Sequence, residues 1–220
     1  MRGEKPMREK KPEPWVQNHE NWCWATAAKI VGLHFCKRKG IRPPVLWEEQ
    51  YPNGIVRDDL TGVLPLYSGC VGGVVTVDAW QYKIVENARD GISNRHGNLP
   101  EYDDAKARAL RYVVTGMVND AAVHIVEYGF YDDEMPLWEQ DCFPDIERAL
   151  GSGFALLGNF VGMTGTAHSV VLLPLGNSRI GVFDPCDGSY GVHSCRQVFE
   201  TGFLTQKGPV LIKWIQYIGQ

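Results

Sequence analysis

The spacing of the apolar residues changes part-way along this chain of 220 residues. In the first two-thirds, apolar side chains recur every three or four residues, which is typical of helices that bury one face. In the last third, they form short or alternating runs bounded by Gly, Pro, Asn and Ser, which indicates strands. Helices followed by strands predict an α+β protein with two lobes.

The first predicted helix is the best defined. Asn21 is a good N-cap, which places Trp22 and Cys23 in the first turn. The basic residues 37–39 favour a helix C-terminus, and Gly40 ends the helix. Five apolar residues at helical spacing form its predicted buried face: Trp24, Ala27, Ala28, Val31 and Phe35.

The remaining elements are predicted from similar patterns. The segment from Ile41 to Val77 is punctuated by Gly and Pro and gives no assignment. Other helices are predicted over 79–89, over 102–118 and from Pro144 to Gly151 or Gly153, and a strand is predicted over 121–130. Further strands are predicted within four runs: FALLGNF, TAHSVVLLPL, RIGVFDP and PVLIKWIQYI.

Length and composition limit the organisation of the chain and its partners. We expect a flexible polar arm over 1–14 and one domain over 15–220, with a helical lobe over about 15–120 and a β-rich lobe over about 121–220. A net charge of −4 argues against a nucleic-acid partner. No run is long enough to cross a bilayer, and no signal-peptide pattern is found. The expected location is the cytoplasm, or outside the cell after export without a cleavable signal peptide. No oligomeric state is predicted.

Cys23 is the thiol with the most suggestive position. Six cysteines are too few for a disulfide scaffold, so mostly reduced thiols are expected. The first turn of a helix favours the thiolate, because its backbone N–H groups and the helix dipole attract an anion. An ordinary thiol is only ~3% ionised at pH 7, and a histidine partner raises that fraction most. A nucleophilic Cys23 therefore needs an imidazole nearby; the alternative interpretation is a small buried thiol.

Among six histidines, His168 is the best placed to be that partner. His19 lies in the loop before the helix, and His34 lies about 16 Å further along the same helix, out of reach. His168 opens an apolar strand, which a turn joins to a second strand that ends at Asp184. A carboxylate behind an imidazole fixes the tautomer of a catalytic histidine. The ordinary alternatives are a hydrogen-bonded strand histidine for His168 and, because Asp184 precedes Pro185, the start of a turn for Asp184.

The hairpin between these two strands makes the pairing testable. A three-residue loop over 176–178 makes the numbers of paired residues add up to 354. His168 then lies opposite Cys186, and Asp184 is its diagonal neighbour on the same face, about 7–8 Å away. A two-residue loop alone would put Asp184 on the opposite face. The pairing therefore requires a loop with an odd number of residues, or a bulge.

Gln17 precedes Cys23 by six positions. Its amide can curl over the start of the helix and donate a hydrogen bond to an oxygen held beside the sulfur. Together with the backbone N–H of Cys23 it would form an oxyanion hole, in which one donor is typically worth ~2.7–4 kcal/mol of barrier. The alternative is a plain loop residue.

The segments QNHENWCWATA and HSVVLLPLGNSRIGVFDP together resemble the papain-like cysteine peptidases. They are most similar to the compact bacterial branches, which are the bacteriocin leader-processing peptidases and the papain-like effector proteases of plant-associated bacteria. The resemblance implies that Cys23 is the nucleophile, His168 the base, Asp184 its orienting partner and Gln17 the oxyanion donor. His168 follows Cys23 by 145 residues, within the roughly 130–150 of this arrangement.

The same resemblance implies a fold and an activity. The fold is papain-like α+β, in which a helical lobe carrying the nucleophile helix packs against an antiparallel β-sheet lobe carrying the His/Asp pair. The activity is hydrolysis of peptide bonds in a peptide or protein substrate, without a cofactor. The leader peptidases imply cleavage after small residues, and the effector proteases imply a host protein. Plant and lysosomal members carry Cys-Gly-Ser before the nucleophile, where this chain has residues 20–22, Glu-Asn-Trp.

Two other functions remain open. An acyl transferase, deamidase or isopeptidase would use the same triad, and ammonia release or amine incorporation without chain cleavage would favour it. A non-catalytic papain-like binding module would keep the scaffold with an inert triad. Unimpaired biological activity of Cys23→Ala would favour the binding module.

Some residues near these motifs have weaker assignments. Trp22 and Trp24 flank the nucleophile and are assigned to substrate binding, with core packing as the alternative. Cys186, His193 and Cys195 include zinc-ligand types, but their spacing lacks a Cys-x-x-C pair and a fourth ligand. No metal site is therefore predicted, and local packing or a disulfide is the preferred interpretation of these three residues.

Overall fold

The structure is a computed structural model of the chain. It describes residues 15–18, 22–57, 75–88, 99–129, 139–140, 143–161, 167–205 and 208–219. The predicted arm over 1–14 and the predicted N-cap Asn21 lie outside the described residues.

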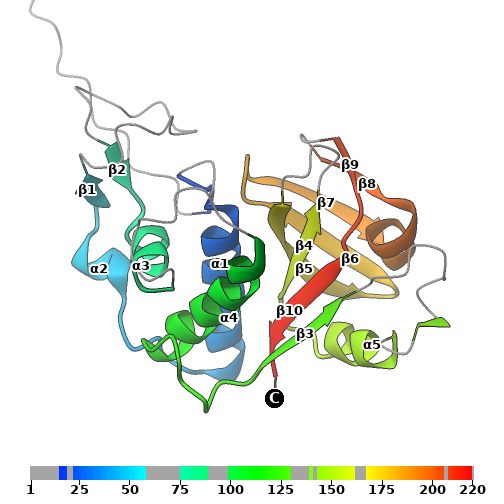
Figure 1. Ribbon diagram of the computed structural model, residues 1–220, viewed down its shortest axis with the longest axis horizontal. Helices are drawn as coiled ribbons and strands as arrows, with labels where there is room; N and C mark the ends of the chain where they lie inside the picture. Colours follow the sequence, from blue (N-terminus) through cyan, green and yellow to red (C-terminus); the bar gives the residue numbers. More distant parts are fainter. Residues whose placement is uncertain are drawn as a thin grey trace, which may run out of the picture.

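The N-terminal half is mainly helical (Figure 1). Its helices are α1 (Cys23–Lys39), α2 (Trp47–Gln50), α3 (Ala79–Ala88) and α4 (Leu99–Thr115). The segment without a sequence assignment contributes α2 and two short antiparallel strands, β1 (Ile55–Arg57) and β2 (Val75–Val77). Helix α4 ends earlier than predicted because Gly116 adopts a φ of +76° and its N–H caps the Tyr112 carbonyl at 2.8 Å. None of the described helices is long and apolar enough to cross a membrane.

The C-terminal half is built on a six-stranded antiparallel sheet in the order β3-β10-β4-β5-β6-β7. Its strands are β3 (Ile125–Gly129), β4 (Leu156–Val161), β5 (Ala167–Gly176), β6 (Arg179–Asp184), β7 (Ser189–Ser194) and β10 (Trp214–Ile218). Helix α5 (Phe143–Gly151), the π-helix η2 (Gln197–Thr201) and the hairpin of β8 (Phe203–Thr205) and β9 (Gly208–Val210) complete this half. The predicted α+β class, with a helical part and an antiparallel sheet, is confirmed. The sequence gives no strand at β7, because this edge strand fully buries none of its residues and so carries no apolar alternation.

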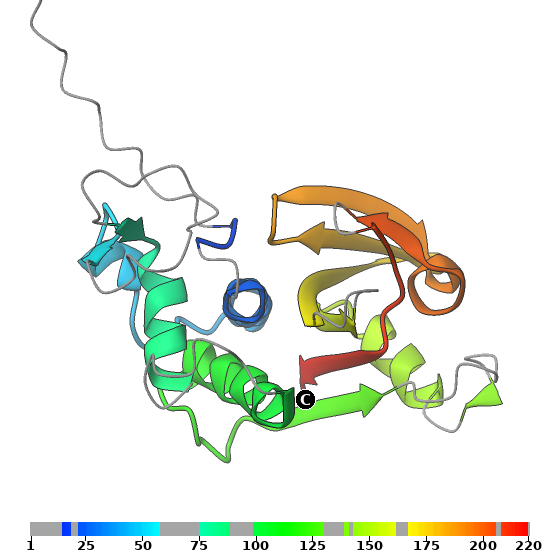
Figure 2. The ribbon, with the colours of Figure 1, turned by 45° about the horizontal axis from the view of Figure 1, so that its top comes forward.

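Helix α1 lies between the other helices and the sheet (Figure 2). The five residues of its predicted apolar face are all buried. The N-terminal part is more enclosed than predicted, because every residue from Cys23 to Lys29 is buried. Gly40 ends the helix as predicted: it adopts a φ of +66°, and the N–H of Ile41 donates to the Cys36 carbonyl at 2.9 Å.

Two hydrophobic clusters cover opposite faces of the sheet. The first joins α1, α3 and α4 to sheet residues such as Leu157 and Val171. The second joins the neighbouring residues Leu156 and Leu172 to α5 and η2. Adjacent residues of a strand point to opposite faces, so the change of cluster between 156 and 157 marks the two sides of the sheet. Because α1 packs directly on the first face, it is held in a fixed position relative to β5 and β6.

Candidate active site

Cys23 is the first residue of α1. The N-cap is Trp22 rather than the predicted Asn21, so Cys23 lies one position nearer the helix start than expected. The Trp22 side chain makes no capping hydrogen bond, and the Trp22 carbonyl accepts the backbone N–H of Thr26 at 2.9 Å and its hydroxyl at 3.0 Å. Backbone N–H groups in a first turn have no partner within the helix, and the dipole there attracts negative charge. Cys23 therefore has the setting that favours a thiolate.

The β5–β6 hairpin has the predicted register but a different turn. Val171 pairs with Phe183, and the numbers of this and the adjacent pairs add up to 354. The turn itself has two residues, Asn177 and Ser178, with φ of +52° and +54°, rather than the predicted three. A bulge between Pro174 and Gly176 inserts the extra residue and restores the register. Two residues with positive φ suit the twist of tightly connected strands, which explains the shorter turn.

Asp184 contacts His168, as this register requires. The distance from Asp184 Oδ1 to His168 Nε2 is 2.6 Å. The same carboxylate oxygen accepts the backbone N–H of Cys186 at 2.8 Å, which fixes the carboxylate at the end of β6. Phe160 of β4 pairs with His168 of β5, and the two rings pack edge-on with their centroids 5.3 Å apart. No sequence signal indicated Phe160, because the register of β4 on β5 cannot be read from local patterns.

The other side of the His168 ring meets Cys23. The two side chains form a hydrogen bond, and because Nε2 contacts Asp184, Nδ1 is the nitrogen left to face the thiol. Burial lowers the pKa of His168, but the charge of Cys23 and the hydrogen bonds with Asp184 and Cys23 outweigh it and raise the pKa to about 9. The imidazolium form is therefore favoured at neutral pH. Helix α1 and strand β5 thus bring together two residues that are 145 positions apart.

Gln17 lies beside the end of β6. Its backbone N–H donates to the Pro185 carbonyl at 2.7 Å, and Pro185 directly follows Asp184. Val16 lies beside Gly188, in the turn after β6: a Cβ built on Gly188 would be 3.1 Å from Val16 Cγ2. Gln17 is fully buried. The structure therefore gathers all four predicted catalytic residues in one region, while the oxyanion role of Gln17 stays a prediction.

The two flanking tryptophans are core residues. Trp22 is 5% exposed and contacts the Tyr82 ring with centroids 6.4 Å apart, and Trp24 is 0% exposed. Both belong to the cluster between the helices and the sheet. Neither offers a surface to a substrate in this conformation, so the substrate-binding assignment is not supported. The cause is the burial of α1 on all sides of its first turns, where every side chain becomes part of the core.

Among the described residues, Cys186, Cys195 and His34 form neither a disulfide nor a metal site. No disulfide joins Cys186 to Cys195. In the part of the chain that the structure describes, no three side chains of His, Cys, Asp or Glu are grouped so that they could hold a metal ion. His34 accepts the backbone N–H of Ala155 at 3.2 Å through Nδ1 and so joins α1 to the start of β4.

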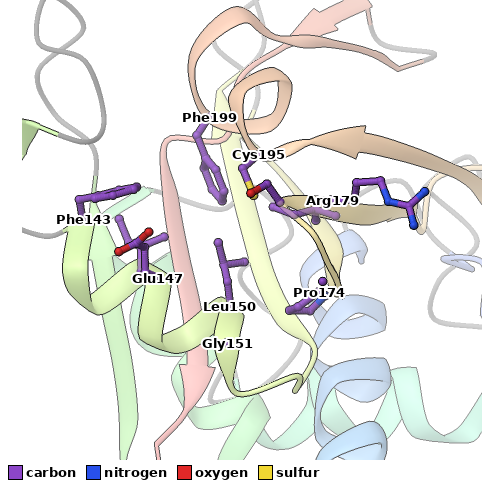
Figure 3. Close-up of a pocket in the computed structure, with 12 residues that line it drawn as sticks. Phe143, Glu147, Leu150, Gly151, Pro174, Arg179, Cys195 and Phe199 are labelled. Carbon is purple, nitrogen blue, oxygen red and sulfur yellow. The ribbon is translucent and has the colours of Figure 1, made fainter.

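A separate pocket of about 250 Å³ lies between α5, the β5–β6 turn and η2 (Figure 3). Leu150 and Phe199 point toward one another across it, and the guanidinium of Arg179 points away. The pocket includes the Cys195 thiol but none of the four predicted catalytic residues. Its walls are mainly apolar, and no histidine stands among the described residues that line it, so it is not the candidate active site.

Comparison with known proteins adds no relative. No family model, curated protein or solved structure matches the chain. Any statement about activity therefore depends on the geometry around Cys23 and on the two motifs that the sequence carries.

Proposed function

We propose that this chain is a papain-like cysteine peptidase that hydrolyses peptide bonds through Cys23, His168 and Asp184. The observation that carries the proposal is the position of the His168 ring, which hydrogen-bonds Cys23 on one side and Asp184 on the other. This arrangement of nucleophile, base and orienting group is the one that activates a thiol. The helix-on-antiparallel-sheet architecture is also compatible with a papain-like fold.

In the proposed reaction, the Cys23 thiolate attacks the carbonyl carbon of the scissile peptide bond. The resulting oxyanion receives hydrogen bonds from the Gln17 amide and the Cys23 backbone N–H. The His168 imidazolium then gives its proton to the leaving amine as the C–N bond breaks, which leaves a thioester on Cys23. Neutral His168 next takes a proton from water, whose oxygen attacks the thioester carbonyl. The C–S bond then breaks, the acid product leaves, and the thiolate–imidazolium pair is restored.

Asp184 orients the ring throughout. Its contact with Nε2 keeps Nδ1 directed at the sulfur, and its negative charge stabilises the imidazolium. Because both side chains are at most 3% exposed, these electrostatic interactions are only weakly screened by water.

Alkylation by iodoacetamide from about pH 4 to about pH 9 tests the ion pair directly. Cys23 is only 3% exposed, whereas Cys186 and Cys195 are partly exposed and would react first if exposure alone decided. The proposal expects Cys23 to react fastest below about pH 7, and His168→Ala to abolish that advantage. A rate at Cys23 no higher than at Cys36, a buried thiol of the same helix, would remove the proposal.

Digestion of an unfolded protein such as reduced casein separates peptide hydrolysis from inert binding. Wild type is expected to produce new N-termini, and Cys23→Ala is expected to produce none. Fast alkylation of Cys23 combined with no cleavage, but with ammonia release or amine incorporation, would show that the same triad serves acyl transfer or deamidation.

A further inference from the structure

A side chain of α3 holds the backbone on both sides of Gln17. The Gln81 Nε2 group donates to the Val16 carbonyl at 2.9 Å, and its Oε1 accepts the backbone N–H of Asn18 at 2.9 Å. Gln81 is 0% exposed, and Asn18 is 2% exposed. One amide group therefore clamps the residue before Gln17 and the residue after it.

The clamp is fixed to the nucleophile helix through a buried ion pair. Asp78 Oδ1 accepts the backbone N–H of Gln81 at 3.0 Å and also the Lys29 ammonium at 3.0 Å. The Asp78 backbone N–H donates to the side-chain oxygen of Asn18. Lys29 belongs to α1, six residues after Cys23. Because buried polar and charged groups are costly without partners, this network holds one geometry.

The stretch over 15–18 is also held from the other side. The N–H of Gln17 donates to the carbonyl of Pro185, the residue after Asp184. Gln17 is thus fixed between the start of α3 in the helical half and the end of β6 in the sheet. Its backbone position is set relative to both the Cys23 helix and the His168–Asp184 pair.

We propose that Gln81 is a positioning residue for the reaction, because it holds the Gln17 amide where the oxyanion forms. This inference rests on the proposed function. A hydrogen-bond donor stabilises a developing oxyanion only if its position is fixed beforehand. Displacement of a reacting or stabilising group by 1 Å can cost about 10²-fold in rate. The Gln81 side chain hydrogen-bonds to Val16 and Asn18 rather than to the reacting groups, so it would act through Gln17.

Two probes of Cys23 separate positioning from a general structural role. p-Nitrophenyl acetate is attacked at its carbonyl, passes through an oxyanion, and releases p-nitrophenolate as an acetyl thioester forms on Cys23; water then yields acetate and the free thiol. Iodoacetamide alkylates the same thiolate by displacing iodide and forms no oxyanion. The ratio of the two rate constants therefore reports on the oxyanion hole alone.

The variant Gln81→Met keeps the shape of the side chain and removes both hydrogen bonds. We expect acylation by p-nitrophenyl acetate to fall about 10²-fold and alkylation by iodoacetamide to stay within about 3-fold of wild type. Gln17→Ala should cost little more in the Gln81→Met background, because both changes remove the same interaction. Gln81→Glu, which keeps the acceptor for Asn18 but not the donor for Val16, gives a second variant if Gln81→Met does not fold; it should show a smaller loss in the same direction.

Val85→Ala is the matched control on α3. Val85 is a core residue, 4% exposed, so this variant loses stability without touching the clamp. It should leave the ratio of the two rates unchanged.

Equal losses of acylation and alkylation in Gln81→Met would overturn the inference. So would a ratio of the two rate constants equal to that of wild type. An effect of Gln17→Ala that is as large in the Gln81→Met variant as in wild type would overturn it as well. Failure of the proposed function has a different signature. In that case neither probe would select Cys23 over the other thiols of the wild-type protein.

Discussion

Replacing Cys23 by alanine should lower the pKa of His168 by more than one unit. The pKa of about 9, against an ordinary value of 6.5, corresponds to about 3 kcal/mol in favour of the imidazolium, at 1.36 kcal/mol per unit. This is a net value, because burial alone would lower the pKa. The charge of Cys23 is the largest of the interactions that raise it. Without the sulfur, the hydrogen bond and the charge of Asp184 still oppose burial, and a nearby opposite charge typically contributes roughly 1–3 pKa units.

The assay is an NMR titration of isotope-labelled histidine between about pH 5 and about pH 10. In wild type, the His168 ring should stay protonated through neutral pH and lose its proton near 9. In Cys23→Ala it should lose the proton at least about one unit lower. Cys36→Ala, which removes another buried thiol of α1 at the far end of the helix, should leave the titration unchanged. Identical titration of His168 in wild type and Cys23→Ala would refute the proposed ion pair.

Three other substitutions change the His168–Asp184 pair, the packing of α1 on α4 and the β5–β6 turn. Asp184→Asn removes the carboxylate that raises the pKa of His168, so the imidazolium loses its proton at lower pH. The alkaline pKa of the pH–rate profile for p-nitrophenyl acetate turnover should therefore fall by roughly one unit, and an unchanged alkaline pKa would contradict this. Gly32→Ala should lower the free energy of urea unfolding by about 1–3 kcal/mol, because the new Cβ would lie 2.6 Å from the Val113 side chain. This clash exceeds the gain in helix propensity of about 1 kcal/mol. Adding Val113→Ala should restore most of the lost stability. Ser178→Gly should raise the unfolding free energy by up to about 1 kcal/mol, since Ser178 has a φ of +54°, and a lower unfolding midpoint would count against that origin of strain.

The sequence predicts that His168 and Asp184 share a face of the hairpin, but it does not predict the turn that joins their strands. Alternation along two strands requires that the two residues share a face if they are to meet, and this condition fixes the parity of the register. How the chain satisfies the condition is a separate matter. Here a bulge near Leu175 and a two-residue turn replace a three-residue loop, because positive φ at Asn177 and Ser178 suits the strand twist.

Other features of the site have no local signature. The sequence pattern fits ligand-binding and core roles of Trp22 and Trp24 equally well, because periodicity does not show whether a helix is covered on one side or on all sides. Gln81 is 64 positions from Gln17, and nothing in its surroundings in the sequence marks it as the residue that brackets that stretch. The contact of Phe160 with His168 likewise depends on a strand pairing that the sequence does not specify.

Local patterns in the sequence by themselves determined where α1 begins to within one residue, where Gly40 ends it, and which face of the last strands must be shared by His168 and Asp184. These features depend on backbone preferences and on periodicity, which act over a few residues. Only the tertiary structure decided that Cys23 meets the ring of His168 and that Gln17 lies between α3 and the end of β6. The reason is that these contacts depend on how the helices pack on the sheet. The surfaces that pack are formed by residues far apart in the chain.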